Sequence, residues 1–275
     1  MKPESRLESI TPDMARHFLT LNKKNRKINK QRVEILTREM KRGDWKVTNQ
    51  GIGFDVDGNL VDGQQRLTSI VKANMTIDMF ITLGLPVDSM DVIDTSHKGR
   101  TCGDLFSMRG ELNSSVLAAG TRLVYQFLPN GKYSSYRNAV SQPELDRTLE
   151  AFPQLREWAS FSTAMRSLRG MLAPSAIVGL GALFSETPEE TITGHEFFTH
   201  LKSGVDLQEN DPILLLRNIL IKNMSSKNRL GHRYQVWLTV KAWNAVNEHR
   251  DIKQLAIKYK ESFPEIFGLD IDVHV

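Results

Sequence analysis

The chain has 275 residues, 40% of them hydrophobic and 25% charged, so we expect a folded globular protein with one large domain or two smaller ones. The 36 Lys and Arg residues exceed the 32 Asp and Glu residues, and the resulting net charge of +4 permits a polyanionic partner without requiring one. The single cysteine, Cys102, excludes an internal disulfide and a zinc site built from several cysteines. The sequence has neither an apolar run of roughly 20 residues nor a secretory signal, which predicts a cytoplasmic protein without membrane contact.

The first third of the chain begins with two helical patterns. Thr11-Pro12 predicts a helix start, because a hydroxyl can cap the first turn and proline fits the first helical position. A second helix is expected from about Lys30 to Arg42, where apolar residues recur at helical spacing. Gly43 follows as its stop signal.

Strand patterns come next along the chain. Residues 51–55 and 60–61 predict two strands joined by a tight turn at Asp57-Gly58. A helical run follows Gly63, and residues 77–83 alternate between apolar and other side chains, which is typical of a further strand.

Beyond residue 111 the sequence shows helix starts but no strand pattern. Such starts are expected at Ser141 with Glu144, at Ala173-Pro174, at Thr187-Pro188 and at Asp211-Pro212, with a long last helix around 234–246. We therefore predict an α+β fold in which a small mixed α/β domain, residues 1–110, precedes an all-helical domain, residues 111–275.

The strand–turn–helix at residues 60–74 carries the clearest chemical signal. Unpaired N–H groups and the positive end of the dipole at a helix start favour an anion, and Gly63 would let a phosphate approach the backbone. Gln64 and Gln65 add amide groups in the first turn, and the planar guanidinium of Arg66 suits phosphate oxygens. Asp62 would repel a bare phosphate, so it is expected to orient Arg66 or to hold a magnesium ion through water.

A purely structural alternative for the same segment stays open. A tight turn in which Arg66 forms an ion pair with Asp62 would explain these residues without any ligand, because Asp-Gly turns are common.

The segment Asp62-Gly63-Gln64-Gln65-Arg66-Leu67-Thr68 resembles the DGQ(H/Q)RL motif of the ParB/sulfiredoxin-like superfamily, including its phage and actinobacterial members. Three further segments match where that fold would place them: Asn25-Arg26, Gly43-Asp44-Trp45, and the stretch from Ile93-Asp94-Thr95 to Arg100-Thr101. The resemblance covers roughly residues 20 to 110. It implies a protein encoded by a phage or mobile element and located in the host cytoplasm.

The resemblance also implies a pocket for the phosphates of an NTP, centred on Arg66, Gly63, Gln64 and Gln65. Arg26, Arg100 and Thr101 are then expected as additional phosphate contacts. Members of the superfamily include NTPases and nucleases, so Asp62 and Arg66 are the expected catalytic residues, and Asp62 and Asp94 the expected ligands of Mg²⁺.

Departures from the family patterns limit which activity of the superfamily we expect. Gln64 replaces the cysteine that sulfiredoxin chemistry needs, and the Gln64-Gln65 pair replaces the Glu-Arg of partition CTPases. A non-catalytic DNA-binding accessory or regulatory protein is therefore the alternative to a magnesium-dependent NTPase or nuclease.

Two basic runs indicate DNA as a partner. Lys23, Lys24 and Lys27 belong to the first, and Arg229 and Arg233 to the second. Each could follow a phosphate backbone, although such runs are also typical of solvated surfaces. The helical domain could in addition mediate a homodimer or bind a protein partner.

Overall fold

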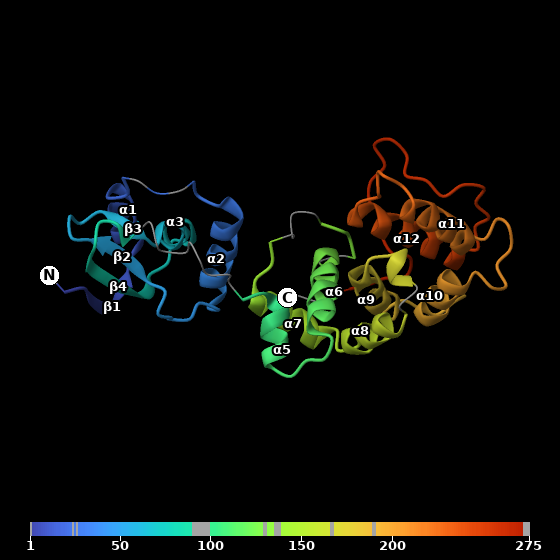
Figure 1. Ribbon diagram of the computed structural model, residues 1–275, viewed down its shortest axis with the longest axis horizontal. Helices are drawn as coiled ribbons and strands as arrows, with labels where there is room; N and C mark the ends of the chain where they lie inside the picture. The colour runs from blue at the N-terminus through green and yellow to red at the C-terminus, as the bar shows by residue number, and fades with distance from the viewer. Residues whose placement is uncertain are drawn as a thin grey trace. The chain divides into compact units, whose positions relative to one another are not determined.

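The computed structural model describes residues 2–23, 25, 27–89, 100–128, 131–134, 139–165, 168–188 and 191–271. The chain divides into two compact units, Met1–Gly99 and Arg100–Val275, here called unit 1 and unit 2. Unit 1 runs from blue to cyan in Figure 1 and unit 2 from green to red.

Unit 1 contains a four-stranded sheet in the order β1-β4-β2-β3. Its strands are β1 (Glu4–Ile10), β2 (Ile52–Asp55), β3 (Leu60–Asp62) and β4 (Ile77–Leu85). β4 pairs antiparallel with β1 and parallel with β2, and β2 pairs antiparallel with β3. The sheet is therefore mixed.

Three helices share one hydrophobic core with this sheet: α1 (Pro12–Thr20), α2 (Lys30–Arg42) and α3 (Gln64–Ala73). Side chains from the strands, among them Ile52 and Met79, are buried with Leu36 and Met40 of α2 and with Leu67 of α3. Figure 1 shows the helices gathered beside the strands of unit 1.

The local signals of unit 1 are confirmed. The Thr11 hydroxyl accepts a hydrogen bond from the Met14 N–H (3.2 Å), and Gly43 ends α2 in the left-handed conformation with φ of 75°. The hairpin between β2 and β3 turns through Gly58, whose φ is 77°.

Strand β1 was not predicted. Its residues Glu4 to Ser9 are exposed or half-exposed, and its polar sequence has no apolar alternation that would mark a strand. Pairing with β4 along its whole length holds it in the sheet.

Unit 2 is helical, with no strand among its described residues. Its helices are α5 (Cys102–Met108), α6 (Ser114–Phe127), α7 (Gln142–Ala151), α8 (Leu155–Ala164), α9 (Pro174–Phe184), α10 (Gly194–Ser203), α11 (Pro212–Met224) and α12 (His232–Asn247), with a short 3₁₀ turn at Leu168–Gly170. The protein is thus α+β, as predicted. In the part of the chain that is described, no helix has the length and apolar character that crossing a membrane demands.

Helix α9 lies at the centre of unit 2. All its residues from Ala176 to Phe184 are buried, and it packs closely on α6 and α8. A Cβ at Gly181 would lie 2.3 Å from the Trp158 ring, so only glycine lets α8 and α9 approach this closely. Helix α5 belongs to unit 2 because it packs against α6.

The predicted helix start at Thr187-Pro188 is wrong. The Thr187 side chain closes the end of α9, because its hydroxyl donates to the Phe184 carbonyl (2.8 Å). The next described helix, α10, begins at Gly194, where Thr193 and Glu196 form a capping box. By contrast, the capping box predicted at Ser141 and Glu144 is confirmed.

The cap of α10 gives a stability prediction. Thr193→Ala removes the hydroxyl that accepts the Glu196 N–H (3.2 Å), so the free energy of unfolding of unit 2 should fall by about 1 kcal/mol. Thr193→Ser keeps the hydroxyl and should stay close to wild type in urea denaturation followed by circular dichroism. Equal stability of the alanine and serine variants would contradict the capping role of the Thr193 hydroxyl.

Candidate functional site

The predicted strand–turn–helix forms as expected. β3 ends at Asp62, Gly63 turns the chain with φ of 101°, and α3 begins at Gln64. A Cβ at residue 63 would lie 3.2 Å from the Cα of Ile52. The left-handed backbone and the close approach to β2 therefore both require glycine at this turn.

Arg66 in the first turn of α3 is held by two partners. Its Nε and Nη2 donate to the Gly51 carbonyl (3.0 and 2.7 Å), and Nη2 also donates to Asp62 Oδ2 (2.8 Å). The other oxygen of Asp62, Oδ1, accepts the Gly63 N–H (2.6 Å). The ion pair of the structural alternative is therefore present, and the Arg66 side chain is only 17% exposed.

The turn keeps hydrogen-bond donors that could bind an anion. No side chain caps the start of α3, whose first backbone bond runs from the Leu67 N–H to the Gly63 carbonyl (2.9 Å). The Nη1 group of Arg66 makes no hydrogen bond to any residue in the described part of the chain. The first-turn N–H groups and this Nη1 are the donors that a phosphate could use.

Only one of the two carboxylates expected to bind Mg²⁺ is described, so the magnesium site stays a prediction. Both oxygens of Asp62 are engaged within the turn. Among residues whose placement is described, no cluster of three His, Cys, Asp or Glu side chains could hold a metal. Asp94, the second expected ligand, lies outside the described residues.

The structure brings together Asp62, Gly63, Gln64, Gln65 and Arg66, and it describes only some of the other expected contacts. Lys23 and Lys27 are exposed, whereas Lys24 and Arg26 lie outside the described residues. Arg100 and Thr101 belong to unit 2, where the Thr101 hydroxyl caps α5 by accepting the Asp104 N–H (3.1 Å). Capping accounts for Thr101 without a ligand.

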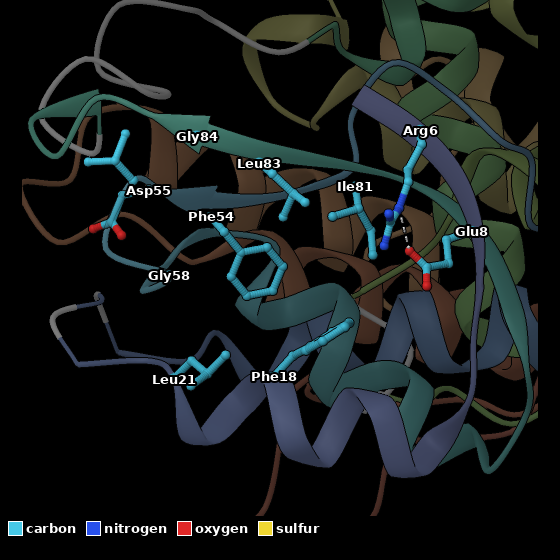
Figure 2. A pocket seen from close by; sticks show the side chains of 11 residues that line it. Arg6, Glu8, Phe18, Leu21, Phe54, Asp55, Gly58, Ile81, Leu83 and Gly84 are labelled. Atoms are coloured by element: carbon cyan, nitrogen blue, oxygen red, sulfur yellow. Dashed lines mark hydrogen bonds and ion pairs between the residues drawn. The ribbon is translucent and has the colours of Figure 1, made fainter. Parts of the chain in front are cut away.

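A separate hollow of about 360 Å³ lies at the other end of β2, and sequence reasoning missed it. Figure 2 shows Phe18 of α1 and Leu21, which follows that helix, facing Phe54 and Ile81 of the sheet across it. An ion pair between Arg6 and Glu8 of β1 (3.1 Å) lines the same hollow. Because β1 was not predicted, its contribution could not be found from the sequence.

The turn at this end of β2 encloses a buried carboxylate. Asp55 accepts hydrogen bonds from the Asn59 N–H (2.7 Å), the Asn59 side chain (3.0 Å) and the Asp57 N–H (3.0 Å). Burial works to raise the pKa of Asp55, but these bonds and the charge of Lys23 outweigh it and lower the pKa below its ordinary value.

A pH dependence follows from Asp55. Since its folded pKa is lowered, the ionised carboxylate stabilises unit 1 above its unfolded pKa, near 3.8, and this contribution is lost as the pH falls through the folded pKa. Asp55→Asn should therefore be less stable than wild type at neutral pH, and the difference should shrink on acidification. Hydrogen exchange of β2 and β3 peptides from pH 7 to about 3 measures this difference. A stability difference between Asp55→Asn and wild type that stays constant over this pH range would contradict a stabilising role of the ionised carboxylate.

Comparison with protein-family models, with curated proteins and with solved structures found no match for this chain. The resemblance to the ParB/sulfiredoxin-like superfamily therefore stays a prediction from its motifs.

Arg66 is expected to be important for stability. Arg66→Ala removes hydrogen bonds from a charged donor to Gly51 and Asp62 and should lower the free energy of unfolding of unit 1 by about 2–3 kcal/mol. Arg66→Lys, which can keep one of these bonds, should fall between alanine and wild type. Hydrogen exchange of the α3 segment is the measurement, and an unchanged exchange rate in the alanine variant would show that the contacts are dispensable.

Proposed function

We propose that unit 1 binds the phosphate groups of a nucleotide at the start of α3 and that the protein acts together with DNA, as a ParB-like protein would. The observation that carries this proposal is the combination of an uncapped helix start after Gly63 with an arginine, Arg66, that is fixed in place and keeps Nη1 unengaged.

The physical argument begins with the backbone. The first N–H groups of a helix carry partial positive charge, and a phosphate accepts hydrogen bonds from them readily. Because Gly51 and Asp62 already hold the guanidinium of Arg66, little conformational entropy is lost when its remaining N–H groups bind.

The hydrogen bonds of Asp62 favour a site that binds a nucleotide over one that hydrolyses it. A hydrolytic step needs a base or a metal ligand beside the phosphate, and both oxygens of this carboxylate already accept hydrogen bonds within the turn. The role of a non-catalytic, DNA-associated regulator is therefore the better supported of the two functions expected from the sequence.

A charge reversal at the second position of α3 tests nucleotide binding without damaging the helix. Gln65→Glu places a carboxylate among the first-turn N–H groups, where it should repel a phosphate while supporting the helix dipole. We expect ATP, CTP, GTP or UTP to raise the melting temperature of the wild type, and Gln65→Glu to weaken the binding at least about tenfold, or roughly 1.4 kcal/mol.

The matched control is Gln31→Glu, which makes the same change at the second position of α2. That helix start is already capped by Asn29, whose side chain accepts the Arg32 N–H (3.1 Å). Nucleotide binding by this variant should equal that of the wild type in calorimetry with and without magnesium chloride. If no nucleotide binds the wild type, or if both glutamate variants bind alike, the proposed site is refuted.

A further inference from the structure

The helical hairpin α11–α12 of unit 2 carries no carboxylate. The sequence from Pro212 to Asn247 contains six Lys and Arg residues but neither Asp nor Glu, although the whole chain has 32 acidic residues. No acidic side chain within the hairpin can therefore neutralise its cations.

Four of these cations are exposed and cluster along the chain at the turn of the hairpin. Lys222 lies in the last turn of α11, Lys227 and Arg229 in the turn, and Arg233 in the first turn of α12. None of the four forms an ion pair with a described residue. Lys241, further along α12, is by contrast paired with Glu261 (2.7 Å).

Hydrogen bonds from both helices fix the shape of the turn. The Asn223 side chain accepts the Leu230 N–H (2.6 Å), and the Gln235 side chain donates to the Leu230 carbonyl (3.1 Å). Within the turn the Ser226 hydroxyl accepts the Asn228 N–H (3.2 Å). These hydrogen bonds support the backbone that carries Lys227 and Arg229.

Aromatic rings position the last of the four cations. The Arg233 guanidinium lies 5.6 Å from the Tyr133 ring centre and 5.7 Å from that of Trp237. Gly231 precedes α12 and offers no side-chain cap, so the positive end of the helix adds to the charge of the turn.

We infer that this turn, residues 222–233, is the surface through which the protein binds the phosphate backbone of duplex DNA; the inference rests on the DNA association in the proposed function. Exposed cations on a hydrogen-bonded turn, in a hairpin without carboxylates, match a polyanion whose charges are regularly spaced. Three apolar or aromatic side chains at the turn, Ile221, Met224 and Tyr234, are exposed as well, so binding to anionic vesicles is one of the outcomes tested below.

The salt dependence of binding tests this surface. The probe is a short duplex of random sequence, titrated by fluorescence anisotropy from about 50 to 200 mM salt. Each lost phosphate contact should reduce the slope of log K against log salt by about one, so Lys222→Gln with Lys227→Gln should reduce it by about two and weaken binding about tenfold.

A charge-matched control is available in the same unit. Lys253 and Lys258 are exposed and lie outside the hairpin, so Lys253→Gln with Lys258→Gln removes the same charge. This control should bind the duplex with nearly the wild-type slope. Equal losses in the two double variants, no duplex binding by the wild type at low salt, or binding to anionic vesicles instead of DNA would each overturn the inference.

The same double variants test the DNA surface independently of the proposed nucleotide site. Both double variants should keep the nucleotide-induced rise in melting temperature, because α3 belongs to unit 1. Loss of duplex binding only in the hairpin variant supports the DNA surface even if no nucleotide binds. Nucleotide binding that depends on Gln65, with duplex binding unaffected in the hairpin variant, refutes the DNA surface alone.

Discussion

The guanidinium of Arg66 joins three parts of unit 1 that are separate in the sequence. It binds the Gly51 carbonyl ahead of β2 and the Asp62 carboxylate at the end of β3, while its own backbone begins α3. Both acceptors are half-buried, and an acceptor that loses water on folding without gaining a partner is costly. The position of the helix start, and with it any site there, depends on this interaction.

The same interaction limits what the site can do. An arginine held by two acceptors has already lost much of its conformational freedom, so it can bind a third group at small entropic cost. The carboxylate that holds it accepts one hydrogen bond on each oxygen, from Arg66 and from the Gly63 N–H. These contacts are the reason why we propose binding, and not turnover, at this turn.

The sequence revealed the parts of the fold that local chemistry decides. Thr11 and Gly43 lie at helix ends because a hydroxyl cap and a left-handed glycine act within one turn. Contacts between residues far apart in the sequence could not be predicted in this way. Nothing near Arg66 identifies Gly51 as its partner. The polar segment β1 becomes a strand only because it pairs with β4. Thr187 has the local signature of a helix start, yet its hydroxyl closes α9 instead. The ion pair between Asp62 and Arg66 was anticipated from the sequence as an alternative, but the bonds of Arg66 to Gly51 and of Asp62 to the Gly63 N–H were not.

The two candidate surfaces differ in how they would hold their ligands. At the start of α3 the donors are backbone N–H groups and one fixed, mostly buried arginine, which act over hydrogen-bond distances. At the turn of α11–α12 the donors are exposed cations, whose attraction reaches further but weakens as salt shortens the screening length to about 10 Å at 0.1 M. Binding at the turn should thus respond to ionic strength much more than binding at α3.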